Sequence, residues 1–90
     1  MIEREAKIVN LEGLHARPAA RIVRLASTFN SEIEICKDGV EVNGKSIMGV
    51  MMLAAECGSS ITIRADGPDA EQAATALVDL VATGFGETMQ

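Results

Sequence analysis

The chain contains one histidine, His15, which lies in the run GLHARP at residues 13–18. Imidazole is the side chain whose ordinary pKa lies near neutrality, so much of it is unprotonated and nucleophilic at neutral pH. The run stands where a loop passes into an expected amphipathic helix. A helix start has unpaired backbone N–H groups and a partial positive charge, which suit phosphate oxygens. This placement predicts that His15 accepts a phosphoryl group, rather than being only a surface or capping histidine.

Three arginines follow the histidine at helical spacing. Arg17, Arg21 and Arg24 are expected on one helix face, although the chain has a formal net charge of −5. The acidic total argues against nucleic acid or an anionic membrane as the main partner. A basic stripe beside His15 predicts instead a partner with an acidic protein surface.

Length and composition set the size of the fold. Ninety residues predict a single domain spanning 1–90, and 48% hydrophobic but only 2% aromatic residues predict a core of aliphatic side chains. The apolar stretch from Ile47 to Ala55 is too short to cross a bilayer, and the first residues lack the pattern of a secretory signal. We therefore expect no membrane insertion and a cytoplasmic location.

The two cysteines, Cys36 and Cys57, have no metal-ligand or redox spacing. We expect reduced thiols, and with a single histidine we expect no metal site and no cofactor.

Hydrophobic periodicity predicts four strands and three helices. Strands are expected at residues 2–9, around Ile33 and Ile35, around Val40 and Val42, and at 60–66. A first helix begins at Ala16 and repeats apolar residues as far as Phe29, with Pro18 tolerated in its first turn. Asp38-Gly39 indicates a two-residue hairpin.

Two further helices complete the predicted order. One spans Ser46 to Ala55, with Gly58 as its nearby stop, and Val50 and Leu53 are expected in the core. The last follows Gly67-Pro68, with Asp69 as its cap, Gln72 completing a capping box, and Gly84 as its stop. The order βαββαβα, with strands that have one apolar face, predicts an α+β fold with an antiparallel sheet covered by helices on one side.

Three runs carry a resemblance to a known family: GLHARPAA at 13–20, GKSIMGVM at 44–51 and GFGE at 84–87. Together they resemble HPr, the histidine-containing phosphocarrier protein of the bacterial phosphoenolpyruvate-dependent phosphotransferase system, over essentially the whole chain. The resemblance implies an open-faced β-sandwich of four antiparallel strands under three helices. It also implies a carrier rather than an enzyme, in which His15 takes a phosphoryl group from enzyme I and passes it to an enzyme IIA domain in sugar transport.

The resemblance also implies roles for particular residues. His15 would use Nδ1, Arg17 would neutralise phosphoryl charge, and the backbone N–H groups of Ala16 and Arg17 would hold the oxygens. Ser46, an ordinary N-cap from its sequence position, matches the serine phosphorylated by HPr kinase/phosphorylase. Five residues match the family's docking surface: Ala20, Arg24, Ile47, Met48 and Met51. We also expect the protein to be a monomer.

Glu12 is the carboxylate near His15 in the sequence, and close contact would oppose an incoming phosphate. Two alternatives remain open. A ferredoxin-like ligand-binding module would be indifferent to substitution of His15. A regulatory HPr paralogue, acting in a nitrogen-linked branch or on a transcription factor, would depend on phosphorylated Ser46, and the presence of His15 speaks against it.

Overall fold

The computed structural model describes residues 1–88. Their order of strands and helices is the one the periodicity predicts. The strands are β1 (Ile2–Lys7), β2 (Glu32–Lys37), β3 (Val40–Asn43) and β4 (Ser60–Asp66). The helices are α1 (Ala16–Ala26), α2 (Ile47–Met52) and α3 (Ala70–Ala82), and a 3₁₀ turn follows at Gly84–Gly86.

The four strands form one antiparallel sheet in the order β1-β4-β2-β3. In β4 the side chains alternate as predicted, since Ile61, Ile63 and Ala65 are buried and the residues between them are not. Ile63 lies opposite Ile35 of β2 in the register. Full burial of such a side chain stabilises the fold by roughly 1.5–3 kcal/mol.

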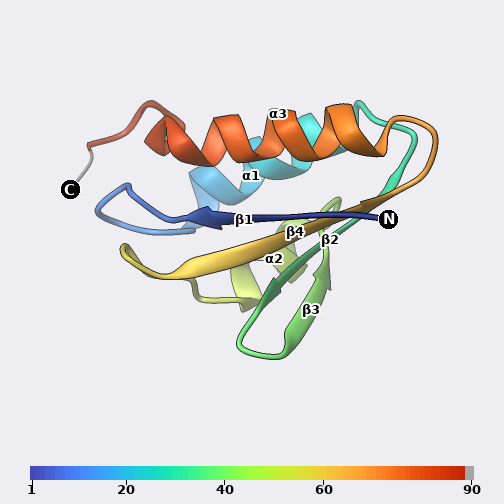
Figure 1. Cartoon of the computed structure of the whole chain (residues 1–90). Coiled ribbons are helices and arrows are strands. Elements are labelled where there is room, and N and C mark those ends of the chain that lie inside the picture. Colours follow the sequence, from blue (N-terminus) through green and yellow to red (C-terminus); the bar gives the residue numbers. More distant parts are fainter. Residues whose placement is uncertain (89–90) are drawn as a thin grey trace.

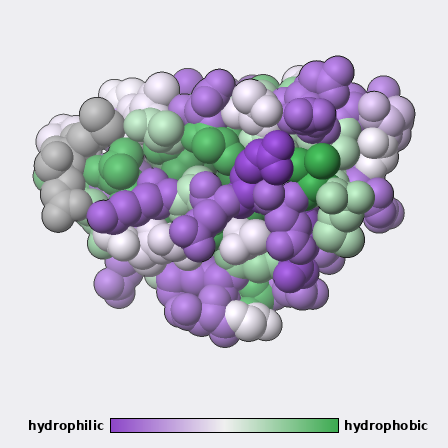
Figure 2. Space-filling view, viewed as in Figure 1, coloured by the Kyte–Doolittle hydropathy of each residue, from purple (hydrophilic) through white to green (hydrophobic). Residues whose placement is uncertain are grey.

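The helices cover one face of this sheet and leave the other open. Figure 1 shows α1 and α3 side by side above the strands, and α2 packs against α1 and β3. The Ala-rich face of α3 lies on β1 and β4, where small side chains allow close approach. Figure 2 shows a hydrophobic band between α3 and the strands within a largely hydrophilic surface. The predicted open-faced sandwich is confirmed.

The β2–β3 connection is the predicted two-residue hairpin. Asp38 and Gly39 have φ angles of 51° and 84°. Positive φ at both central residues gives a turn whose twist matches that of the flanking strands. Gly39 has no Cβ to strain this conformation, and aspartate tolerates it better than most residues.

Several helices and strands are shorter than predicted, and the difference is largest for α2. This helix covers only Ile47–Met52 and ends just before Ala54, which adopts a positive φ of 50°, well ahead of Gly58. Val50 and Leu53 are buried, as expected. The first helix ends at Ala26, leaving Phe29 half-buried beyond it, and β1 ends at Lys7 rather than residue 9.

Asp69 stands at the N-cap position of α3, but its side chain does not cap the helix, and the predicted capping box with Gln72 is wrong. The carboxylate instead accepts hydrogen bonds from the backbone N–H groups of Asn30 and Ser31, both at 2.9 Å, and from the Ser31 hydroxyl. It therefore ties the start of α3 to the segment that leads into β2.

These bonds predict how stability depends on pH. The Ser31 hydroxyl and the Asn30 N–H hold the pKa of Asp69 below its ordinary value of 3.8, against the opposing effect of burial. A lowered pKa contributes stability above 3.8 that is lost as the pH falls through the folded-state value. We expect Asp69→Asn to be less stable than the wild type at neutral pH, with the difference shrinking below 3.8. Urea unfolding of both proteins across this range measures it, and a gap independent of pH would contradict the assignment.

Candidate functional site

His15 lies at the junction of a loop and a helix, where the sequence placed it. It is the N-cap residue of α1, with φ −76° and ψ −170°, and its carbonyl accepts the Ala19 N–H at 3.0 Å. The side chain makes no capping hydrogen bond, and 38% of it is exposed. The imidazole is therefore held on the surface by groups other than its own helix.

The loop before His15 is fixed against the segment that follows α2. Gly13 has a φ of 69°, and a Cβ there would overlap the carbonyl oxygen of Ala55. The Leu14 N–H donates to that same oxygen at 2.9 Å, and the buried Leu14 side chain joins the core. A glycine is required at position 13 by both the backbone angle and the close approach.

The first turn of α1 provides two open donors. Within residues 1–88 the backbone N–H groups of Ala16 and Arg17 have no hydrogen-bond partner, Pro18 has no N–H, and Ala19 is the first residue bonded into the helix. These donors sit next to the His15 backbone, and the Arg17 side chain is exposed beside them. This arrangement suits a small anion attached to His15.

Glu87 is the carboxylate in contact with the histidine. Its Oε1 lies 3.0 Å from Nε2 of His15. The His15 hydrogen bond, together with one from Asn10 and the charge of Arg17, holds the pKa of Glu87 below its ordinary value despite burial. Because an ionised carboxylate only accepts, the ring donates from Nε2. In the neutral ring Nδ1 then carries the lone pair, and it has no hydrogen-bond partner among the described residues.

The sequence pointed to Glu12 as the carboxylate near His15, and the structure places Glu87 there instead. Glu12 is exposed and makes no hydrogen bond or ion pair with the ring in the described part of the chain. The contact with Glu87 spans 72 residues, so no local spacing reveals it. In the sequence, Glu87 stood out only as the last residue of the GFGE run at 84–87.

The C-terminal segment is held in place by several contacts. The Arg21 guanidinium donates to the Phe85 carbonyl, the Phe85 side chain is buried, and the Leu11 N–H donates to the Thr88 carbonyl at 3.0 Å. Arg21 thus belongs to the support of Glu87. Of the three arginines in the predicted basic stripe, only Arg17 and Arg24 are exposed and make no hydrogen bond or ion pair within residues 1–88.

Ser46 is the N-cap of α2, as predicted, and its Oγ accepts the Gly49 N–H at 3.1 Å. The helix behind it exposes an apolar patch, defined as Ile47, Met48, Met51 and Met52. Because α2 packs against α1, the patch adjoins the helix that carries half-buried Ala20 and exposed Arg24. The family resemblance pointed to Ile47, Met48 and Met51 but not to Met52, which is 73% exposed.

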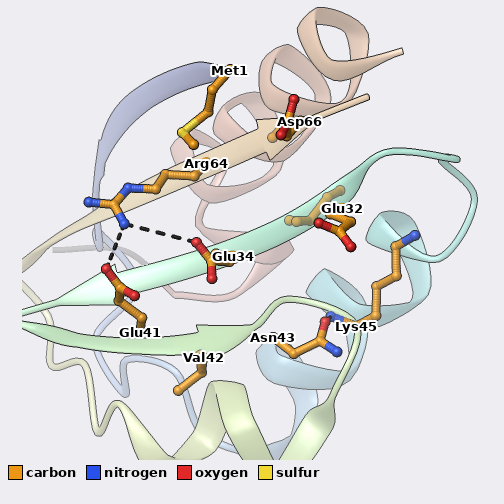
Figure 3. A pocket seen from close by; sticks show the side chains of 11 residues that line it. Met1, Glu32, Glu34, Glu41, Val42, Asn43, Lys45, Arg64 and Asp66 are labelled. Carbon is orange, nitrogen blue, oxygen red and sulfur yellow. Dashed lines mark hydrogen bonds and ion pairs between the residues drawn. The ribbon is translucent and has the colours of Figure 1, made fainter. Parts of the chain in front are cut away.

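Two open hollows differ in their chemistry. One, of about 480 Å³, is lined by His15, Leu14, Glu12 and residues 54–57. The other, of about 420 Å³, lies on the uncovered face of the sheet and is shown in Figure 3. There the Arg64 guanidinium lies 2.6 Å from Glu41 and 3.9 Å from Glu34. Its charge is therefore already neutralised, and neither a histidine nor a cysteine lines this hollow.

The described residues contain no group of three or more His, Cys, Asp or Glu side chains placed to hold a metal ion. Burial raises the pKa of the Cys36 thiol. None of the helices in residues 1–88 combines the length and hydropathy that a membrane span needs.

Comparison with known proteins agrees with the resemblance seen in the sequence. A family model described as "PTS HPr component phosphorylation site" matches residues 2–83. The phosphocarrier protein HPr of Cupriavidus necator is 48% identical over 87 residues, covering 97% of this chain and 98% of that protein. The HPr-like protein Crh of Halalkalibacterium halodurans is 47% identical over 81 residues, covering 90% and 96%.

A solved structure gives the same answer for the fold. The crystal structure of HPr-C-His from Thermoanaerobacter tengcongensis superposes with a TM-score of 0.94 at 48% identity, covering 99% of this chain and 100% of that one. The matches in sequence and in structure extend over nearly the full length of the chain, including His15 and its loop. The chain therefore belongs to the HPr family of phosphocarrier proteins.

Proposed function

We propose that this protein carries a phosphoryl group on Nδ1 of His15, accepting it from enzyme I and passing it to an enzyme IIA domain. The observation that carries the proposal is the bond between Nε2 and Glu87, which leaves an unprotonated Nδ1 at a helix start. The protein is in this account a substrate and donor for other enzymes, and not itself an enzyme. It acts as a monomer in the cytoplasm.

The transfer is a displacement at phosphorus. The lone pair of Nδ1 forms the new P–N bond while the bond between phosphorus and its carrier atom on enzyme I breaks, returning its electron pair to that atom. The three phosphoryl oxygens are received by the N–H groups of Ala16 and Arg17 and by the Arg17 guanidinium. The Nε2–H of His15 keeps its bond to Glu87 throughout, so the ring needs no rearrangement.

The modest strength of this site suits a carrier. A helix terminus favours an anion at an exposed position by only about 0.3–1 kcal/mol. An exposed phosphohistidine held this weakly is able to move on to the next acceptor, whereas a deep anion pocket would trap it. Alignment and most charge stabilisation then come from the partner in each complex.

The apolar patch, with Ala20 and Arg24, is the proposed docking surface. Methionine side chains adapt to differently shaped partners, which suits a surface used by both donor and acceptor. Because both partners must reach His15, they bind in alternation. Arg17 and Arg24 beside the patch favour an acidic partner surface and speed its association.

The proposed function is tested by incubating the protein with enzyme I and phosphoenolpyruvate. We expect a mass increase of one phosphoryl group, lost on brief exposure to acid, and no increase when phosphoenolpyruvate is omitted. Transfer onward to an enzyme IIA domain should restore the original mass. An adduct that survives acid, or none at all with an active enzyme I, would contradict the proposal.

Ser46 is the proposed regulatory position, and phosphorylation by HPr kinase/phosphorylase would add roughly −1.5 to −2 charges beside the docking surface. We expect Ser46→Asp to slow phosphorylation of His15 by about tenfold, because a like charge weakens the attraction of an acidic enzyme I. Rates of phosphoryl transfer at low and high salt measure the effect, which salt should reduce.

Ser46→Asn is the matched control. Asparagine and aspartate both supply the acceptor that the Gly49 N–H needs, so the two variants differ mainly in charge. Equal rates for Ser46→Asp and Ser46→Asn would show that charge is not the cause.

A further inference from the structure

A buried asparagine lies behind the histidine. Asn10 is completely buried, and its Nδ2 donates to the Gly13 carbonyl at 2.8 Å and to Glu87 Oε1 at 3.1 Å. No pattern in the sequence singles out this residue, which follows β1 in the segment before His15. Its side chain makes these two hydrogen bonds and no others within residues 1–88, and both lead to His15.

Both of its acceptors also hold the histidine. The Gly13 carbonyl accepts a hydrogen bond from the His15 backbone N–H at 3.0 Å, and Glu87 Oε1 accepts one from the ring N–H at Nε2, also at 3.0 Å. The Asn10 amide therefore contacts both the oxygen that accepts the His15 backbone N–H and the oxygen that accepts the N–H of its ring. The two protons of an amide nitrogen lie in fixed directions, so using both fixes the two acceptors relative to each other.

We propose that Asn10 is a positioning residue for His15: its amide holds Glu87 and the Gly13 carbonyl so that the ring keeps its proton on Nε2 and presents Nδ1 to the phosphoryl donor. Its effect on transfer rests on the proposed function, whereas the positioning belongs to the unphosphorylated protein. Asn10 touches no reacting atom and acts through Glu87 and the loop.

A purely structural role explains the asparagine poorly. Its Oδ1 is buried and has no hydrogen-bond partner among the described residues. Burying an unpaired oxygen is unfavourable, and an apolar side chain would avoid the cost. What the asparagine provides, and an apolar residue does not, is the pair of N–H donors aimed at Gly13 and Glu87.

The first test follows the proton on the imidazole by ¹⁵N NMR of the ring in the free protein. We expect the wild type to show the Nε2–H form and Asn10→Ala to show a mixture of both neutral forms. Ser31→Ala is the matched control, because Ser31 is the other buried polar residue among residues 1–88 and contacts Asp69 at the start of α3, whereas Glu87 follows the opposite end of that helix. It should lose stability and keep the wild-type ring spectrum.

The second test measures phosphorylation by enzyme I. We expect Asn10→Ala to be about tenfold slower, since a loosely held acceptor spends less time aligned with its donor. Ser31→Ala should match the wild type. In a Glu87→Ala background the substitution at Asn10 should have a smaller effect than it has alone, because the two residues act in one chain of contacts.

The outcomes separate this inference from the proposed function. A changed ring spectrum in Asn10→Ala, in a protein that enzyme I never phosphorylates, supports the positioning role and contradicts the carrier function. A wild-type ring spectrum and rate in Asn10→Ala overturns the positioning role alone. If Asn10→Ala does not fold, an NMR pH titration of the wild-type protein replaces it. The side-chain amide resonances of Asn10 should shift as Glu87 titrates. Amide resonances that do not change over that titration would refute the inference.

Discussion

Replacing His15 by alanine is expected to abolish phosphorylation by enzyme I while the domain stays folded. No other imidazole is present in the chain to accept the group. The substitution removes no capping bond, and the His15 carbonyl that starts α1 is retained. The lost pair with Glu87 is partly exposed, and such pairs contribute about 0–1 kcal/mol. Intact-mass analysis after reaction with enzyme I, together with thermal unfolding, measures both parts of the prediction.

His15→Gln sharpens this experiment. Glutamine is a polar side chain with an amide N–H donor that could reach Glu87, but it has no nucleophilic nitrogen. We expect it to be as inactive as His15→Ala and at least as stable. An acid-labile adduct of wild-type stoichiometry in either variant would mean that another residue is the acceptor.

Gly13→Ala is expected to have the largest effect on stability, roughly 2–5 kcal/mol of the free energy of unfolding. Positive φ costs a residue with a Cβ about 1–2 kcal/mol, and overlap in a packed region costs typically about 1–3 kcal/mol more. The new Cβ meets the Ala55 carbonyl oxygen, which also holds the Leu14 N–H. Displacing this loop moves His15, so the transfer rate should fall by about 100-fold for a shift near 1 Å.

Gly39→Ala is the control for this prediction. Gly39 also has positive φ, 84°, but a Cβ there meets nothing within 4 Å. Urea unfolding should therefore show only the smaller conformational cost, and phosphorylation should stay at the wild-type rate. Equal losses of stability in the two variants would contradict the tight contact at Gly13.

Most of the fold could be predicted from local patterns because each element buries one face. The alternation in β4 and the three- and four-residue repeats in α1 and α3 determined their types, and Asp38-Gly39 determined the hairpin. The end of α2 could not be predicted, because Ala54 adopts a left-handed conformation that its sequence does not favour. Asp69 was misassigned because its partners, Asn30 and Ser31, are 38 or more residues away.

The candidate site divides in the same way. The position of His15 at a helix start and the cap at Ser46 follow from neighbours in the sequence, whereas Ile47, Met48 and Met51 of the apolar patch were expected from the family resemblance. The groups that orient the ring do not, because Glu87 contacts the ring, and Asn10 contacts Glu87, only when the segment after α3 lies against the loop. Glu12 was the expected carboxylate because nearness in sequence was the only guide to contact.

Nδ1 of His15 is the atom proposed to accept the phosphoryl group, and NMR of the phosphorylated protein shows whether it does. After reaction with enzyme I and phosphoenolpyruvate, ¹⁵N and ³¹P spectra of the labelled protein identify the nitrogen bonded to phosphorus. We expect phosphorus on Nδ1, with the proton on Nε2 still donated to Glu87. Phosphorus on Nε2 would show that the Glu87 contact breaks during transfer and that the arrangement described here does not select the acceptor.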